Sequence, residues 1–212
     1  MLDQVSQSNV GPRGQQSGRR PLIVALSGTT RPNSSTEFAL RIAVEAARGG
    51  GADVQFFGGA DLDLPLYSPE IVERTPRAQR LVAALRQSDG ILIASPNYHG
   101  GLPGLVKNAL DYVEDLRDEP APYFDGRPVG CILTGSGAQG AVTALTSLRA
   151  VVHALRGWPT PLGVCINTSS PVFDETGVCL VDSVQPQLVT VGLQVVRFAL
   201  AARASAELSR PA

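Results

Sequence analysis

Short, wholly apolar segments alternate along this chain with segments of helical periodicity. Runs such as Leu-Ile-Val-Ala-Leu from residue 22 and Ile-Leu-Ile-Ala from residue 91 are typical of parallel strands that helices cover on both faces. Between them, apolar residues recur at spacings of three and four, the period of an amphipathic helix. The pattern predicts strands at residues 21–27, 52–57, 90–94, 127–134 and 160–167, and helices at 36–48, 77–87, 103–116, 141–155 and 181–206.

Five strands alternating with helices indicate an α/β domain with a doubly wound, five-stranded parallel sheet. Right-handed crossovers leave two usual strand orders, the Rossmann-like order and the flavodoxin-like order 2-1-3-4-5. No internal repeat or second domain is visible. We expect one domain over residues 21–206, preceded by a disordered tail at 1–20, where apolar residues are scarce, and followed by a tail at 207–212.

Composition narrows the classes of partner. The formal net charge is −1, which gives no electrostatic reason to expect nucleic acid or an anionic membrane as partner. No apolar run approaches the ~20 residues of a membrane span, and the N-terminus lacks the apolar core of a signal peptide. A cytoplasmic protein is therefore expected.

The three cysteines, Cys131, Cys165 and Cys179, lie far apart in the sequence and form no CxxC or Cys/His cluster. Buried, reduced thiols are the expectation, and neither a disulfide framework nor a metal site is predicted.

The loop after the first predicted strand is rich in hydroxyl groups. Six of its ten residues, Ser-Gly-Thr-Thr-Arg-Pro-Asn-Ser-Ser-Thr from Ser27 to Thr36, carry a hydroxyl, and Arg31 is its only charge. Hydroxyls, backbone amides and a helix N-terminus together suit a phosphate dianion that is bound without a metal. A helix N-cap in a polar turn needs only one or two such residues, so we predict a phosphate site. The loop is not a P-loop, since GxxxxGK[ST] is absent.

The loop after the fourth predicted strand contains a literal GxGxxG, from Gly135 to Gly140. In dinucleotide-binding folds that fingerprint belongs to the first strand–helix turn and precedes an acidic residue by about 20 positions. No Asp or Glu occurs between Gly126 and Phe173. The motif instead suggests either close approach of backbone to a ligand held mainly elsewhere or a plain structural turn.

The third predicted strand leads into Ser95-Pro96-Asn97-Tyr98-His99-Gly100-Gly101-Leu102-Pro103, and then into an amphipathic helix. A strand's carboxyl end followed by a loop and a helix N-terminus is the usual ligand site of an open α/β sheet. The loop carries an aromatic ring and an imidazole but no nucleophile paired with a base. It therefore suits a flat ligand better than a hydrolytic reaction.

Together these loops resemble the NADPH-dependent FMN reductase family of the flavodoxin-like quinone, azo and chromate reductase group. That family's signature PxYxxxxPGxLKNALD(W/Y) corresponds to the residues from Pro96 to Tyr112, and its GSxRxxS signature corresponds to the loop from Ser27 to Thr36. The resemblance covers roughly residues 22–158.

The resemblance implies the 2-1-3-4-5 order, an FMN cofactor and NADPH or NADH as electron donor. Hydride would pass from the nicotinamide to the flavin and then to a second acceptor, such as free flavin, a quinone or a similar small molecule, with no essential side-chain acid or base. The FMN phosphate would be held by Ser27, Thr29, Arg31, Ser34, Ser35 and Thr36. The isoalloxazine would be wrapped by Pro96, Asn97, Tyr98, His99 and Gly100, and bordered by Gly135, Ser136 and Gly140.

The resemblance also implies a homodimer or homotetramer, with a flavin-dependent monooxygenase as one possible acceptor of reduced flavin. His99 either lies beside the flavin and influences proton or hydride transfer, or is simply exposed. Two other functions stay open. In the first, the bound FMN would dehydrogenate or reduce a particular small organic metabolite in a biosynthetic pathway. In the second, the chain would be a flavodoxin-like electron carrier, although its net charge is near zero and flavodoxins are usually strongly acidic.

Overall fold

The computed structural model describes residues 19–208, and in it the predicted strands form one parallel sheet. The strands are β1 (Leu22–Ser27), β2 (Asp53–Phe57), β3 (Gly90–Pro96), β4 (Pro128–Gly135), β5 (Trp158–Pro159) and β6 (Val164–Asn167). The helices are α1 (Ser35–Gly49), α2 (Gly59–Leu62), α3 (Pro76–Gln87), α4 (Gly104–Asp111), the 3-10 helix η1 (Tyr112–Leu116), α5 (Ala138–Ala154) and α6 (Val184–Leu208).

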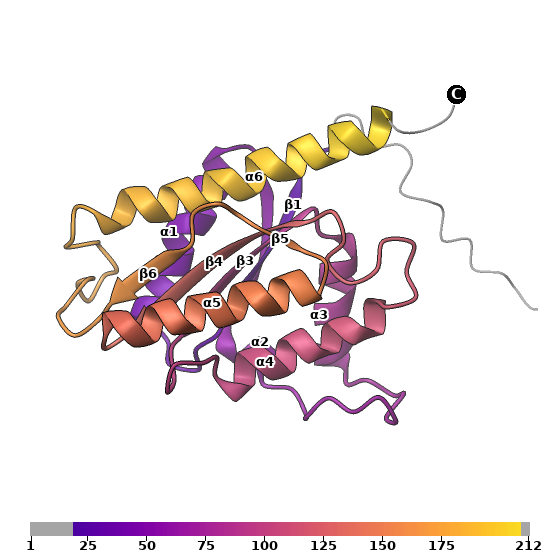
Figure 1. The fold of residues 1–212 in the computed structure, drawn as a ribbon, viewed down its shortest axis with the longest axis horizontal. Helices are drawn as coiled ribbons and strands as arrows, with labels where there is room; N and C mark the ends of the chain where they lie inside the picture. The colour runs from indigo at the N-terminus through magenta and orange to yellow at the C-terminus, as the bar shows by residue number, and fades with distance from the viewer. Residues whose placement is uncertain (1–18, 209–212) are drawn as a thin grey trace, which may run out of the picture.

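The strand order is β2-β1-β3-β4, and the position beyond β4 is shared by β5 and then β6, all in parallel (Figure 1). The expected flavodoxin-like order 2-1-3-4-5 is therefore confirmed. Because every pair is parallel, the carboxyl ends of the strands meet at one edge of the sheet. Ser27 pairs with Ala94, Pro96 with Thr134, and Gly135 with Asn167.

The fifth strand differs from the expected continuous strand at 160–167. It begins earlier, at Trp158, breaks off after Pro159 and resumes at Val164. Pro159 and Pro161 have no N–H to donate to a neighbouring strand, so they are tolerated only at an edge position. The chain leaves the sheet between them, and Thr160 turns its hydroxyl to the Leu162 carbonyl at 3.0 Å.

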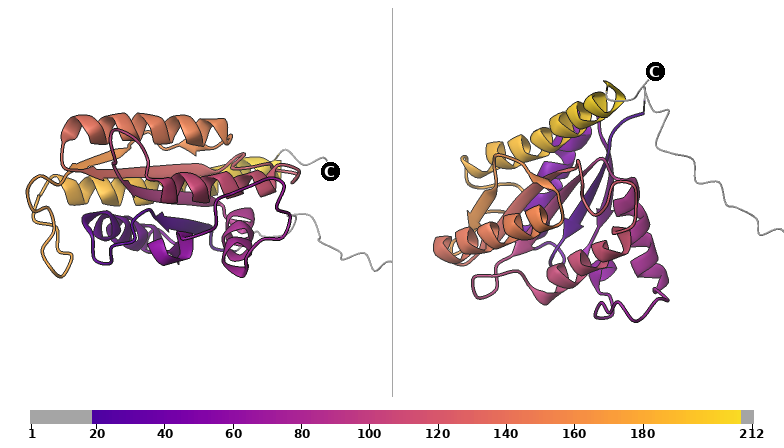
Figure 2. Two further views of the ribbon diagram at one scale, coloured as in Figure 1. Left: turned by 90° about the horizontal axis from the view of Figure 1, so that it is seen from below. Right: turned by 45° about the vertical axis from the view of Figure 1, so that its right-hand side comes forward.

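Two helical layers cover the sheet. One core cluster joins one face of the strands to α3, α4, η1 and α5, and a second joins the other face to α1 and α6. The left view of Figure 2 shows α5 on one side of the strands and α1 with α6 on the other. Both faces are thus buried, which accounts for the apolar character of β1, β3 and β4.

The ends of the expected domain lie partly outside the described residues. Residues 1–18 and 209–212 are not described, so the predicted tails are seen only at their inner ends. Arg19 donates to the Asp89 carboxylate at 2.8 Å, and α6 continues to Leu208, two residues past the predicted domain end.

By length and composition, α6 from 184 to 206 is apolar enough to cross a membrane, which corrects the expectation that no segment is. Core helices of soluble proteins pass the same test. Leu188, Val191 and Val195 are fully buried against the sheet and α1. Its apolar character therefore has an explanation within the fold.

α6 packs closely against the backbone of α1 at Gly192. A Cβ atom placed on Gly192 would lie 2.2 Å from the Ala43 carbonyl oxygen, a contact that backbone atoms cannot relieve without moving one helix. Only glycine, which has no Cβ atom, lets α1 and α6 pack together at this point.

We predict that Gly192→Ala lowers the free energy of unfolding by about 1–3 kcal/mol, the usual cost of overpacking a core. Gly49→Ala is the matched control, because nothing lies within 4 Å of its Cβ position and alanine favours a helix. Urea unfolding of both variants checks this. Equal stability of the two would show that the helices do not pack as closely as described.

Candidate functional site

Every predicted site residue lies at the carboxyl edge of the sheet. Ser27, Pro96 and Gly135 are the last residues of β1, β3 and β4. The others lie in the loops that follow these strands or in the first turns of α1 and α5: Thr29, Arg31, Ser34, Ser35, Thr36, Asn97, Tyr98, His99, Gly100, Ser136 and Gly140. Parallel pairing has thus brought together three loops that are far apart in the sequence.

Two hydroxyls of the first loop accept hydrogen bonds from backbone amides within the same loop and the start of α1. Ser34 is the N-cap of α1 and accepts from the Glu37 amide at 3.3 Å, as helix N-caps do. Thr29 accepts from the Arg31 amide at 3.2 Å. These two hydroxyls stabilise the loop itself, whereas Arg31 is exposed.

Ser27 is different. It is 1% exposed, and its Oγ is the single buried side-chain nitrogen or oxygen without a hydrogen-bond partner in the part of the chain that the structure describes. A buried, unpaired hydroxyl costs about 1–3 kcal/mol. A ligand oxygen at this position would recover that cost.

Thr134 joins the first loop to β4. The Oγ1 atoms of Thr36 and Thr134 lie 2.6 Å apart and both side chains are buried. Their mutual bond uses one of the two hydroxyl hydrogens, which leaves the second to donate elsewhere. Thr134 was not among the predicted residues, and its only signal in the sequence is a hydroxyl at the end of an otherwise apolar strand.

The loop after β3 contains a tight turn. β3 runs two residues further than expected, to Pro96, and the Asn97 amide still donates to the Thr134 carbonyl at 2.6 Å. Tyr98 and Gly101 exchange backbone hydrogen bonds of 3.1 and 3.0 Å. His99 and Gly100 have φ of 52° and 80°, the positive values that a type I′ turn requires at both central positions. Tyr98 and His99 are both exposed.

The Asn97 side chain lies between this turn and the glycine-rich loop. Its Oδ1 accepts from the Gly100 amide at 2.9 Å. A Cβ on Gly135 would lie 3.2 Å from its Nδ2, and a Cβ on Gly140 would lie 2.4 Å from it. Two of the three glycines in the GxGxxG sequence therefore make room for Asn97. α5 begins at Ala138, three residues earlier than expected, so Gly140 is in the helix.

The loop after β6 adjoins the same edge, since the Thr168 amide donates to the Gly135 carbonyl at 2.8 Å. Further on, Asp174 accepts from the Thr176 hydroxyl at 2.7 Å and from the Val178 amide at 2.9 Å. These bonds, led by that of Thr176, lower the pKa of Asp174. The carboxylate is therefore ionised and committed to its own turn.

α4 holds the segment after α2 in place. The Asn108 side chain donates to the Leu64 and Pro65 carbonyls at 3.2 and 2.9 Å and accepts from the Tyr67 amide at 2.8 Å. The Tyr112 hydroxyl donates to the Pro65 carbonyl at 3.0 Å. The KNALDY part of the motif is thus scaffold, and its spacing alone gave no indication of these partners.

Arg74 secures the end of that segment. Its guanidinium donates to both Asp115 oxygens at 2.8 Å and lies 4.6 Å from the Tyr67 ring centroid. The hydrogen bond to Asp115 raises the pKa of Arg74. Lys107 pairs with Asp111 at 2.5 Å, as the i, i+4 spacing predicts.

The expectation of buried thiols holds for one cysteine only: Cys131 is buried, whereas Cys165 and Cys179 are partly exposed. All three are free, and burial raises the pKa of Cys131 to about 12. Cys131 therefore stays protonated at neutral pH and is not a nucleophile.

Comparison with known proteins agrees with this geometry. Residues 21–170 match the model of the NADPH-dependent FMN reductase family. The chain belongs to this family. The expected FMN cofactor and NAD(P)H-dependent oxidoreductase chemistry on a small-molecule substrate are thereby confirmed as the class of the protein.

The curated relatives are azoreductases by name. The chain is 28% identical over 155 residues to the FMN-dependent NADPH-azoreductase of Staphylococcus aureus, a match that covers 71% of this chain and 79% of the relative. It is 27% identical over 129 residues to the NADPH azoreductase of a Bacillus species, covering 60% of this chain and 66% of that protein, just under two thirds.

Solved structures share the fold. The flavoenzyme NAD(P)H:(acceptor) oxidoreductase FerB of Paracoccus denitrificans superposes with a TM-score of 0.70 at 21% identity, covering 85% of this chain and 98% of that chain. An NADH:FMN oxidoreductase in its apo form gives 0.62 at 21% identity, covering 85% and 89%.

We predict that Gly140→Ala disrupts the turn at Tyr98–Gly101. The added Cβ displaces the Asn97 amide and so removes its bond to the Gly100 N–H. Amide hydrogen exchange of Gly100 and Gly101 is expected to become faster, by about tenfold for the loss of 1–1.5 kcal/mol of hydrogen bonding.

Gly137→Ala is the control, because no atom lies within 4 Å of the Cβ position of Gly137. In this variant the amide exchange of Gly100 and Gly101 should stay unchanged. Faster exchange in both variants would show that the effect comes from α5 rather than from Asn97.

Proposed function

We propose that this protein is an NADPH-dependent flavin enzyme that binds FMN across the carboxyl edge of the sheet and reduces a second, small-molecule acceptor such as free flavin, a quinone or an azo compound. The observation that carries the proposal is the buried, unpaired Ser27 hydroxyl at the end of β1, where the loop that leads to the N-terminus of α1 begins. It supplies a donor where the hydroxyl-rich loop and the helix dipole favour an anion.

In this proposal the phosphate is held without a metal. Ser27 and the spare hydroxyl hydrogen of the Thr36–Thr134 pair donate to phosphate oxygens from inside, while Thr29, Ser34, Ser35 and exposed Arg31 enclose them from the loop. Among the described residues no group of three or more His, Cys, Asp or Glu side chains is placed to bind a metal ion. Hydroxyls, amides and one guanidinium suit a phosphate dianion.

The flat part of the cofactor is assigned to the second and third loops. The backbone of 96–100 faces the ring system, and Gly135, Ser136 and Gly140 border it, with Asn97 fixing the distance between the two loops. Bound FMN supplies the hydride and electron transfer, and the chain supplies binding, orientation and backbone dipoles. With Tyr98 and His99 exposed, the chain leaves room there for a nicotinamide and then an acceptor.

The cellular setting belongs to the same proposal. We infer a cytoplasmic homodimer or homotetramer with a flavin-dependent monooxygenase as a possible recipient of reduced flavin. The support is the resemblance in motif and the family membership. An acceptor specific to one pathway is the competing version, because the rigid segments after α2 and β6 are suited to shape a pocket.

The visible spectrum of the purified protein tests the function. We expect stoichiometric binding of added FMN, anaerobic loss of the flavin absorption on addition of NADPH, and its recovery on addition of a quinone or an azo dye. Bound FMN that is inert to both NADPH and NADH would favour the pathway-specific version. A protein that does not bind FMN would contradict the proposal.

Ser27→Ala tests the site. Because the hydroxyl has no partner in the protein, its removal should leave the free energy of unfolding of the apoprotein unchanged or higher. FMN affinity, measured by titration of flavin fluorescence, should fall about tenfold or more, because a hydrogen bond from the hydroxyl to the charged phosphate is lost.

Ser34→Ala is the comparison in the same loop for apoprotein stability alone, because Ser34 also encloses the proposed phosphate. It removes the N-cap of α1 and should lower apoprotein stability by about 1 kcal/mol. If Ser27→Ala instead destabilises the apoprotein and leaves FMN affinity unchanged, Ser27 is a structural residue and not a phosphate ligand.

A further inference from the structure

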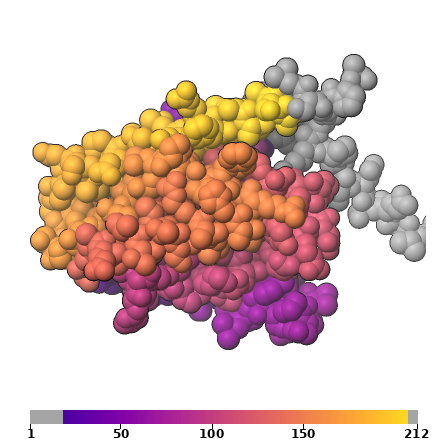
Figure 3. Space-filling view, in the orientation of Figure 1, coloured from indigo at the N-terminus to yellow at the C-terminus, as the bar shows by residue number. Residues whose placement is uncertain are grey.

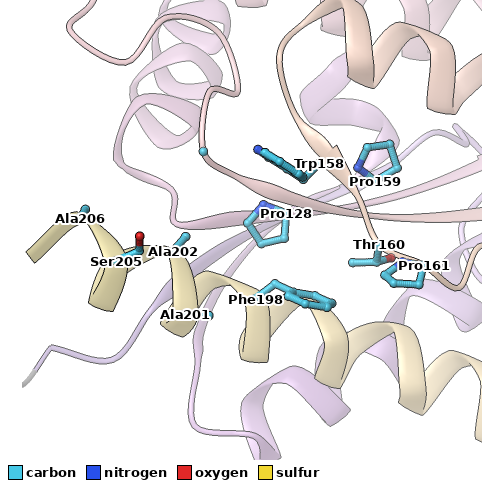
Figure 4. A pocket seen from close by; sticks show the side chains of 11 residues that line it. Pro128, Trp158, Pro159, Thr160, Pro161, Phe198, Ala201, Ala202, Ser205 and Ala206 are labelled. Atoms are coloured by element: carbon cyan, nitrogen blue, oxygen red, sulfur yellow. The ribbon is translucent and has the colours of Figure 1, made fainter. Parts of the chain in front are cut away.

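A hollow of about 620 Å³ lies at the opposite end of the sheet from the predicted FMN residues. It borders Pro128 at the start of β4, and at about 3.3 Å per residue that strand places Pro128 about 23 Å from Gly135. Its lining is formed by the start of β4, the break in the edge strand and the last turns of α6 (Figure 4): Gly126, Pro128, Trp158, Pro159, Thr160, Pro161, Phe198, Ala201, Ala202, Ser205 and Ala206.

The break in the edge strand forms one wall of the hollow and holds it rigidly. Where the chain leaves the sheet, the Thr160 amide still donates to the Val129 carbonyl at 2.9 Å, and Arg149 donates to the Thr160 carbonyl at 3.0 Å. The Leu162 amide donates to the Gln194 side chain on α6 at 3.2 Å. This wall is therefore tied to the sheet, to α5 and to α6.

The opposite wall is the C-terminal part of α6, which passes beside this segment at the surface (Figure 3). It presents Phe198 and then three alanines to the hollow. Small side chains on the helix leave space that the Trp158 and proline rings across from them do not fill, as Figure 4 shows. Trp158 is 69% exposed, a large apolar surface to leave in water.

The chemistry of the lining restricts what fits. None of the eleven lining residues is charged, and five of them carry rings. The Thr160 hydroxyl donates to the Leu162 carbonyl, and the indole N–H of Trp158 is a further side-chain donor in the lining. Small-molecule sites typically measure about 300–1,000 Å³ and combine apolar, aromatic walls with a few polar groups.

We propose that this hollow is a second binding site, for an uncharged, flat, ring-containing organic molecule that carries a hydrogen-bond acceptor. The ring packs between Trp158 and Phe198, and the alanines of α6 line its edge. The acceptor atom lies at the rim, within reach of the indole N–H of Trp158. Because the lining includes no predicted flavin residue, this site does not depend on the proposed function.

Trp158 provides the test, because it is the only tryptophan in the chain and gives a single indole N–H signal in a nitrogen–proton correlation spectrum. The full-length protein is titrated with 1-tetralone, a neutral bicyclic aromatic ketone. We expect the signal to shift and saturate at one equivalent with a micromolar dissociation constant. Naphthalene-1-carboxylate, which is charged, should bind at least tenfold more weakly.

Two matched variants locate the site. Ala202→Leu fills the hollow and should weaken 1-tetralone binding at least tenfold, whereas Ala204→Leu makes the same change at an exposed position outside the lining and should have no effect. If Ala202→Leu does not fold, Phe198→Ala replaces it, since loss of the ring wall should also weaken binding.

A signal that fails to saturate, or that responds equally in Ala202→Leu, overturns the proposal. The proposal is also overturned if the parent protein binds no 1-tetralone and sedimentation shows that it is an oligomer, whereas Ala202→Leu is a monomer. In that case the hollow is an interface between copies of this chain.

Discussion

Parallel pairing of β1, β3 and β4 is the constraint on which the rest of the structure depends. It buries both faces of the sheet under α1 and α6 on one side and α3, α4 and α5 on the other. It also forces all strands to end at one edge, so that the three loops after Ser27, Pro96 and Gly135, which are far apart in the sequence, lie at the same edge. The side chains of β1, β3 and β4 are apolar over most of each strand, and polar side chains collect where these strands end.

Side chains from the loops at that edge contact a neighbouring loop or strand. The Thr36–Thr134 hydroxyl pair links the first loop to β4, and Asn97 links the second loop to the third. Gly135 and Gly140 leave space for Asn97, so a sequence that looks like a dinucleotide fingerprint is here a packing requirement. The same letters arise because both situations need a position without a Cβ atom.

The two ends of the sheet differ in character. At the carboxyl end, hydroxyls and backbone amides surround an unpaired Ser27 hydroxyl. At the other end, Pro159 and Pro161 interrupt the edge strand and leave an uncharged hollow beside α6. Only an edge position tolerates such an interruption, because a central strand would lose hydrogen bonds on both sides.

The apolar periodicity of the sequence determined the alternation of strands and helices and the positions of most elements, and local residue chemistry placed the hydroxyls after β1. The pattern left two strand orders open, and the order 2-1-3-4-5 was expected only from the family resemblance. The tertiary structure decided which hydroxyls are used within the protein and which is left unpaired: Ser34 caps a helix, Thr36 meets Thr134, and Ser27 meets nothing. It also decided that Asn108 holds the segment after α2 and that the fifth strand breaks. These outcomes depend on partners far away in the chain, and periodicity and motif spacing carry no information about such contacts.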